Sequence, residues 1–422
     1  MNLLIRNAKI IDPNSPHHLK VKDIFIKNGS ISAIGSKLKG NAAVRELTGN
    51  NIHVSPGWLD LNASLGDPGF EYKEDITSGM KAAAAGGFTG VCCTPDTFPV
   101  IHSKSEIEYV KQKSAGGLVD VWPVGALTKN LEGKEITEMY DMRQSGAVAF
   151  SDAYKSISDA GVMMRALLYA KSFDGVIFSY PEDYSVSNHS VMNESEMSVM
   201  LGMHGNPSLS EELIIIRDLY LLDYTESRLH FSMISTRRAV SLIKESKSKG
   251  TKLSAAVSPF HLFATDELLK DFDSNYKINP PLRTKEDVKA LIKGISEGTI
   301  DVICSAHVPQ DIESKNVEFE MALHGIISLE TAFAIANTAL KKSVSIEQII
   351  NCFAIAPRKI LSLNPVVIDE DDEANLTIFD PEKSWIYEEK NIRSKSKNSP
   401  FIGQTFTGKI LGVVNNNKMQ LN

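Results

Sequence analysis

Strands that alternate with helices over most of the chain limit its possible folds more than any other feature. From about residue 54, short apolar strands such as FTGVCCTP are followed by stretches of helical periodicity such as Ser103–Lys113. This alternation is typical of parallel βα units. About eight units lie between the strand at Ile52–Leu61 and the strand TIDVICSAH. The sequence therefore predicts an α/β fold with a closed, TIM-like (β/α)8 barrel over residues 54–364.

The two ends of the chain have a different pattern. Residues 1–53 contain short alternating strands, and Asn28-Gly29 has the sequence of a two-residue hairpin turn. Strand-like segments return after residue 365 in ANLTIFD, SWIYEE and TGKILGVVNNNKMQL. We therefore expect residues 1–53 and 365–422 to pair into one small β-sandwich domain beside the barrel.

Composition excludes several kinds of protein. The net charge of the 422 residues is −7 and no long basic block occurs, which argues against nucleic acid or a membrane surface as a main partner. No apolar run approaches the roughly 20 residues of a membrane-spanning helix. The four cysteines have no C-x-x-C spacing, and the first residues form a strand pattern rather than a signal peptide. A reducing cytoplasm is the expected location.

The ends of the barrel strands should carry any functional side chains. A hydrolytic metal site there would need a cluster of His, Asp or Cys ligands. None of the ten histidines falls in H-x-H, H-x-x-H or HExxH spacing, and only His261 and His307 stand at strand ends. The sequence thus has few metal ligands where a barrel enzyme would need them.

A series of blocks resembles the class I dihydroorotases of the amidohydrolase superfamily. In order, they include PGWLDLNASLGDPG, CCTPDTFPV, GAVAFSDAYKSISD, SPFHLFATDE, KINPPLRTKED and DVICSAHVPQD. The resemblance covers nearly the whole chain. It implies an amidohydrolase-type barrel, and it implies a family that uses zinc to open or close a cyclic amide in pyrimidine biosynthesis.

The same resemblance implies where the catalytic residues should be, and most of them are replaced. The positions of the family's metal-binding histidines hold Asn62, Ser64, Tyr180 and Met233. The position of the aspartate that serves as base and metal ligand holds Ala306, and one carboxylate remains at Asp152. The substrate-binding positions hold Gly66, Asp96 and Gln310. Four polar residues are retained without an assigned role: Asp60, His261, Asn279 and His307.

These replacements affect the metal, the base and the substrate contacts together. Zinc lowers the pKa of its bound water from about 16 to about 7, but it needs three or four ligands. Amide and hydroxyl groups are weak ligands, and Tyr180 and Met233 are unsuited to a hydrolytic zinc ion. We expect Tyr180, Met233 and Phe260, which are bulky and mostly apolar, to point inward and fill the vacated space.

The sequence therefore indicates a non-catalytic relative of dihydroorotase with a structural or regulatory role and no zinc. Resemblance to non-catalytic homologues implies assembly with aspartate transcarbamoylase, and resemblance to the family implies a homodimer. Two alternatives stay open. One is an active zinc-dependent cyclic amidohydrolase with a divergent site, and the other is a homo-oligomeric scaffold.

Overall fold

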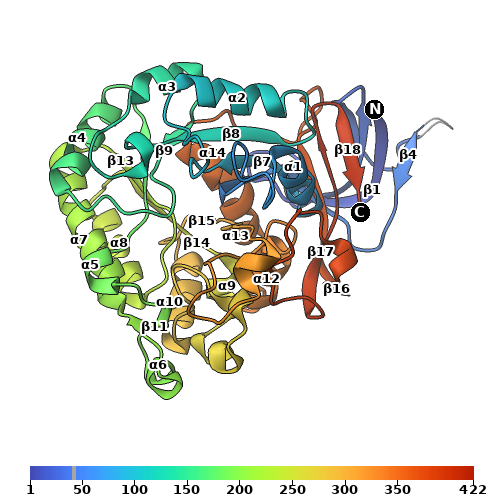
Figure 1. Ribbon diagram of the computed structural model, residues 1–422. Coiled ribbons are helices and arrows are strands. Elements are labelled where there is room, and N and C mark those ends of the chain that lie inside the picture. The colour runs from blue at the N-terminus through green and yellow to red at the C-terminus, as the bar shows by residue number, and fades with distance from the viewer. Residues whose placement is uncertain (40–43) are drawn as a thin grey trace.

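A ring of parallel strands forms the centre of the protein, whose computed structural model describes residues 1–39 and 44–422 (Figure 1). The strands are neighbours in chain order: β6 (Trp58–Ala63), β7 (Phe88–Cys93), β8 (Asp120–Gly125), β9 (Ala149–Phe150), β10 (Val176–Ser179), β13 (Arg228–Phe231), β14 (Leu253–Val257) and β15 (Val302–Ile303). A parallel bridge between Ala63 and His307 brings the last strand against the first. The expected (β/α)8 barrel is confirmed.

Helices surround this ring (Figure 1). The longer ones are α1 (Ile76–Ala85), α2 (Lys104–Ser114), α3 (Met139–Ser145), α4 (Ala160–Lys171), α7 (Ser208–Thr225), α8 (Arg237–Ser248), α10 (Lys285–Ser296) and α12 (Ala332–Leu340). The short ones are α5 (Tyr184–Ser187), α6 (Glu196–Leu201), α9 (Pro259–Phe263), α11 (Ile312–Lys315), α13 (Ile346–Ile350) and α14 (Ala356–Ile360). Within the described ranges, no helix combines the length and the apolar character needed to cross a membrane.

An aromatic cluster closes the amino-terminal end of the barrel. Trp58 opens β6, is fully buried and packs against Phe88, Phe333, Phe353 and Phe379. Each such ring pair contributes about 0.5–1.5 kcal/mol beyond the burial of its area. With this end packed, the opposite end, where the strands finish, is left for a site.

Both chain ends pair into a second sheet, on the right of Figure 1. Its strands are β1 (Asn2–Ile10), β2 (Val21–Lys27), β3 (Ser30–Gly35), β4 (Arg45–Leu47), β5 (His53–Pro56), β16 (Leu376–Ile386), β17 (Thr405–Asn415) and β18 (Lys418–Leu421). They form one hydrogen-bonded sheet around a separate apolar core. Asn28 and Gly29 have positive φ angles of 52° and 86°, as the predicted hairpin turn requires. The expected separate strand SWIYEE is wrong, because its first residues continue β16 after a register shift.

Candidate functional site at the barrel mouth

Asp60 joins the first and last strands of the barrel. It is fully buried in β6, and its carboxylate accepts hydrogen bonds from the backbone N–H (2.5 Å) and the hydroxyl (2.6 Å) of Ser305. Burial raises the pKa of Asp60 to about 6, although both hydrogen bonds favour the ionised form. Both carboxylate oxygens are thus engaged by donors from the protein.

Tyr154 lies among the positions where metal-binding histidines were expected. Its hydroxyl donates to Asn62 Oδ1 at 2.6 Å, and its ring meets Tyr180 edge-on at 5.9 Å between centroids. Ser64 donates instead to Asp96 Oδ2 at 2.8 Å. The sequence pattern alone assigns no role to Tyr154. The available signal was a bulky aromatic residue two positions after Asp152.

The expected base and carboxylate positions do not form an acid–base pair. Ala306 is buried and carries only a methyl group. Asp152 accepts a hydrogen bond from the backbone N–H of Thr128 (2.8 Å) and another from the hydroxyl of the same residue. Burial raises the pKa of Asp152 to about 6. Asp152 therefore anchors the loop that follows β8.

Three bulky side chains occupy the mouth only in part. Tyr180, Met233 and Phe260 are nearly completely buried and belong to one apolar cluster with Ala306. A hollow of about 480 Å³ nevertheless remains, and Met233, Phe260 and Ala306 line it. The expectation that these side chains fill the vacated space is therefore wrong for this part of the mouth.

His261 contacts the loop that precedes α10. Its Nδ1 lies 2.5 Å from Ser258 Oγ, and its Nε2 lies 3.1 and 3.2 Å from the carbonyl oxygens of Pro280 and Pro281. Burial lowers the pKa of His261 to about 4, so the ring is neutral at physiological pH. Both ring nitrogens serve loop structure.

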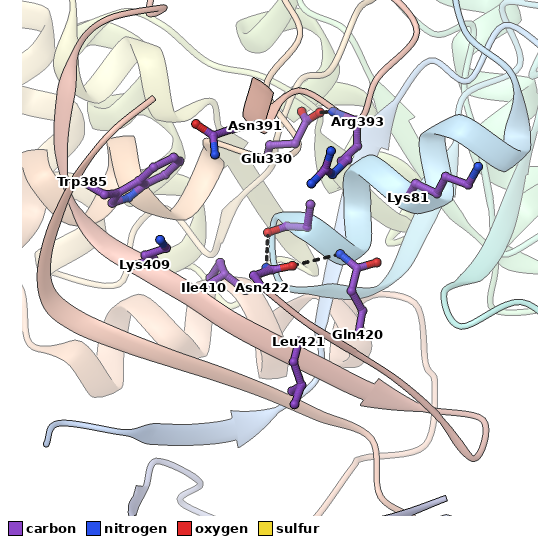
Figure 2. Close-up of a pocket in the computed structure, with 11 residues that line it drawn as sticks. Lys81, Glu330, Trp385, Asn391, Arg393, Lys409, Ile410, Gln420, Leu421 and Asn422 are labelled. Carbon is purple, nitrogen blue, oxygen red and sulfur yellow. Dashed lines mark hydrogen bonds between the residues drawn. The ribbon is translucent and has the colours of Figure 1, made fainter. Parts of the chain in front are cut away.

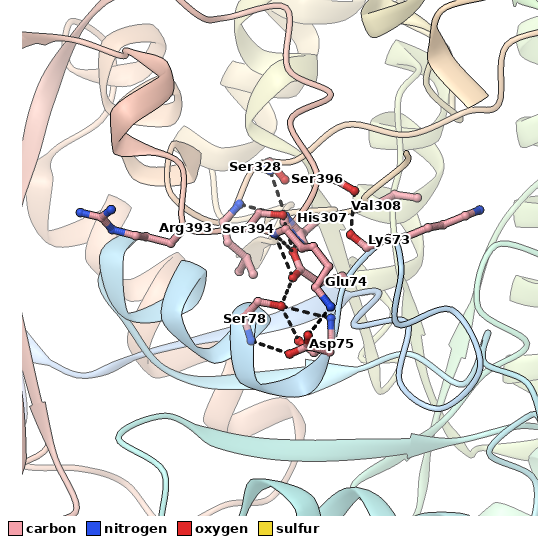
Figure 3. A network of polar contacts seen from close by, with 12 residues as sticks. Lys73, Glu74, Asp75, Ser78, His307, Val308, Ser328, Arg393, Ser394 and Ser396 are labelled. Carbon is pink, nitrogen blue, oxygen red and sulfur yellow. Dashed lines mark hydrogen bonds and ion pairs between the residues drawn. The ribbon is translucent and has the colours of Figure 1, made fainter. Parts of the chain in front are cut away.

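His307 belongs to a buried network that reaches the C-terminal segment (Figure 3). Its Nδ1 accepts a hydrogen bond from the backbone N–H of Ser328 (3.1 Å), which leaves Nε2–H facing Glu74 at 3.4 Å. Glu74 also accepts from the hydroxyl of Ser394 and the backbone N–H of Lys395. Burial opposes ionisation of Glu74, but His307 and these donors hold its pKa below the usual range. No pattern in the sequence singles out Glu74.

The expected substrate-binding positions are also integrated into the fold. Gly66 has a φ of +66°, and a Cβ there would lie 2.6 Å from the carbonyl oxygen of Glu74. The backbone N–H of Gln310 donates to Asn398 Oδ1 (3.0 Å), and its side-chain amide donates to the carbonyl of His324 (2.8 Å). Asn279 donates to Glu182 at 2.7 Å. An arginine clamp at position 66 would require the loop to move.

The donor set of the mouth does not fit a hydrolytic zinc ion. Zinc requires three or four nitrogen, sulfur or carboxylate ligands around one point. In residues 1–39 and 44–422, no group of three or more His, Cys, Asp or Glu side chains is placed to hold a metal ion. Asn62 and Ser64 hydrogen-bond to Tyr154 and Asp96 instead, and the buried hydroxyl of Tyr180 has no partner among the described residues.

A second hollow, of about 550 Å³, lies where α1 meets the C-terminal strands (Figure 2). Lys81, Trp385, Arg393 and Lys409 line it. Asn422 closes one side, donating to the carbonyl of Ala85 at 3.1 Å. None of the residues expected to be functional lines this hollow.

Solved structures define the class of this fold. An L-hydantoinase (dihydropyrimidinase) from Arthrobacter aurescens matches with a TM-score of 0.86 at 22% identity, covering 99% of this chain and 95% of that one. A dihydropyrimidinase from Brevibacillus agri matches with a TM-score of 0.85 at 20% identity, covering 100% and 95%. The chain therefore shares the fold of these two proteins, a barrel with a terminal sheet, over nearly its whole length.

Sequence comparison narrows this class to a family. A family model described as dihydro-orotase-like matches residues 52–239. A dihydroorotase from Caldicellulosiruptor saccharolyticus is 41% identical over 422 residues, covering 99% of this chain and 98% of its own. One from Ruminiclostridium cellulolyticum is 39% identical over 411 residues, covering 97% and 96%. The chain belongs to the dihydroorotase-like family.

Proposed function

We propose that this chain is a dihydroorotase-like protein that lacks zinc-dependent hydrolysis and has a structural or regulatory role in pyrimidine biosynthesis. The observation that carries this proposal is the arrangement around Tyr154. Its phenol hydrogen-bonds to Asn62 and packs against Tyr180, two of the positions expected to bind zinc. Neither position carries a histidine, and the side-chain oxygen of Asn62 is already hydrogen-bonded to Tyr154.

The loss of the base supports the same proposal. Amide hydrolysis at neutral pH needs an activated water molecule and a group that transfers its proton. Ala306 cannot transfer a proton, and loss of a general base alone typically lowers the rate about 10²–10⁴-fold. Asp152, the nearest retained candidate by resemblance, is engaged by Thr128.

A steady-state assay tests this proposal. The purified chain is incubated with dihydroorotate and, separately, with carbamoyl aspartate in the presence of zinc. The dihydroorotase of Caldicellulosiruptor saccharolyticus, 41% identical, serves as the matched positive control. We expect no turnover above background in either direction. Turnover within about a hundredfold of the control would contradict the proposal, because the combined losses predict a larger reduction in rate.

We further propose that the chain forms a homodimer and assembles with aspartate transcarbamoylase. The support is the resemblance to non-catalytic homologues. Co-expression with the aspartate transcarbamoylase of the same genome, followed by light scattering during size exclusion, tests this assembly. A joint peak at micromolar concentration supports it. Separate peaks contradict it, and a lone large homo-oligomer would favour the scaffold alternative.

An active cyclic amidohydrolase is the second candidate. Two observations favour it: the identity of about 40% to proteins named dihydroorotase, and the hollow of about 480 Å³ that persists at the mouth. The turnover assay separates the candidates, because a divergent active site would still hydrolyse a cyclic amide.

A further inference from the structure

The hollow at the barrel mouth has the size and lining of a small-molecule site. Its volume of about 480 Å³ falls within the roughly 300–1,000 Å³ that is usual for ligand pockets. Met233, Phe260 and Ile278 give it an apolar side, and a few polar side chains converge on it. Such pockets use the apolar side for affinity and the polar groups for selectivity.

The unpaired hydrogen-bonding groups around this hollow are acceptors. Asp96 Oδ1, Gln310 Oε1 and His324 Nδ1 are buried without a partner. The orientation of the Gln310 amide is fixed, because its Nε2 donates to the carbonyl of His324. Burial lowers the pKa of His324 to about 4, so its ring is neutral and one of its two nitrogens is an acceptor. Each unpaired acceptor is costly when dry, and a donor would satisfy it.

The charges around the hollow favour the same kind of ligand. Asp96 and Glu182 line it, and neither has a cationic side chain within ion-pair distance in the part of the chain that the structure describes. Lys155 also lines it, with its ammonium 3.4 Å from the carbonyl oxygen of Leu131. Gly66 leaves no room for an arginine beside the mouth. A carboxylate ligand would therefore meet two like charges, against one ammonium that already lies beside a backbone carbonyl.

We propose that the mouth binds a small molecule with a planar, cationic group rich in N–H donors, such as an amidine or guanidine, on a compact apolar body. Asp96 pairs with the cation, Gln310 and His324 accept N–H bonds, and the side of Met233 and Phe260 contacts the apolar body. This binding rests on the proposed loss of the zinc site, because a zinc ion with its water would compete for the same end of the barrel.

Three probes of nearly equal size test this selectivity: benzamidine, benzamide and benzoate, which are cationic, neutral and anionic. Ligand-observed NMR titration of the full chain measures their binding. We expect benzamidine to bind with a Kd near the millimolar range and at least about tenfold more tightly than benzoate, a difference of about 1.4 kcal/mol. Equal or tighter binding of benzoate, or no binding of benzamidine at about 10 mM, would overturn the proposal.

Variants locate the binding. Asp96→Asn should weaken benzamidine binding about tenfold and leave benzamide nearly unchanged, because a charge-assisted hydrogen bond is lost. Asp223→Asn, at an exposed position of α7, is the matched control and should change nothing. Ser190 lines the hollow, so the indole of Ser190→Trp would occupy part of it and should abolish binding of all three probes. Unchanged benzamidine binding in both Asp96→Asn and Ser190→Trp would place the probe elsewhere and refute the site.

The two proposals fail in different ways. Zinc-dependent turnover of dihydroorotate would refute the proposed function, whatever the probes do. Preference for benzoate in a protein without turnover would refute only the cationic selectivity of the mouth.

Discussion

The contact between Ser305 and Asp60 allows a test of how the barrel is closed. Ser305→Ala removes the hydroxyl that donates to Asp60 Oδ2 at 2.6 Å and keeps the backbone donor at 2.5 Å. Asp60 is fully buried, so no water replaces the lost donor. A hydrogen bond to a charged group contributes about 1.5–3 kcal/mol, and we expect the free energy of unfolding to fall by about 2 kcal/mol at pH 8.

The same variant has a defined pH dependence. Burial raises the folded-state pKa of Asp60 from 3.8 to about 6, so the buried charge opposes folding above that pH. Loss of a donor to the ionised form raises this pKa further. The cost of Ser305→Ala is therefore complete above the raised pKa. It shrinks as the pH falls through about 6, because the carboxyl group then takes up a proton.

Urea denaturation at pH 8 and pH 5 measures both effects, with the fluorescence of buried Trp58 as one probe of unfolding. Ser248→Ala is the matched control, because its hydroxyl donates to a carbonyl at the exposed end of α8. The control should change stability by less than about 0.5 kcal/mol. Equal destabilisation by Ser305→Ala at both pH values would refute the role given to ionised Asp60.

Three further predictions concern other parts of the mouth. Gly66→Arg should lower the melting temperature without improving carboxylate binding, because the new Cβ would lie 2.6 Å from the Glu74 carbonyl oxygen; an unchanged melting temperature would contradict this. Glu74→Gln should speed amide exchange around Ser394, because the hydroxyl of Ser394 then loses its ionised acceptor. In the unmodified protein, the same faster exchange should appear only as the pH falls below 4.5 and through the lowered pKa of Glu74. Tyr154→Phe should cost about 1 kcal/mol, and a double-mutant cycle with Asn62→Ala should give a coupling of at least about 0.5 kcal/mol, whereas additive effects would argue against their hydrogen bond.

Local sequence patterns predicted most of the fold. The helix expected over Ser103–Lys113 is α2, Lys104–Ser114, and Asn28-Gly29 forms the expected turn. Helix α7 ends after Thr225, where Glu226 lies in the left-handed region without the glycine that usually signals a helix end. The sequence pattern predicted two separate strands in place of β16, because a register shift interrupts the alternation of its side chains.

The site was predictable by position but not by contact. The resemblance placed Asp60 and Asn62 on the first barrel strand, and both are buried in β6. The hydrogen-bond partners in this region come from distant segments of the chain. Ser305 lies 245 residues from Asp60, and Ser394 lies 320 residues from Glu74. No periodicity or turn signal encodes such pairs, so they could only be found in the folded chain.

The zinc content of the purified chain tests the central claim most directly. The protein is produced in zinc-supplemented medium beside the dihydroorotase of Ruminiclostridium cellulolyticum, 39% identical, and both are analysed by mass spectrometry of the metal after gel filtration. The claim that Asn62, Ser64, Tyr180 and Met233 do not form a metal site predicts zinc far below one equivalent in this chain, with retention in the relative. One or more equivalents of zinc per chain, held through gel filtration, would contradict it.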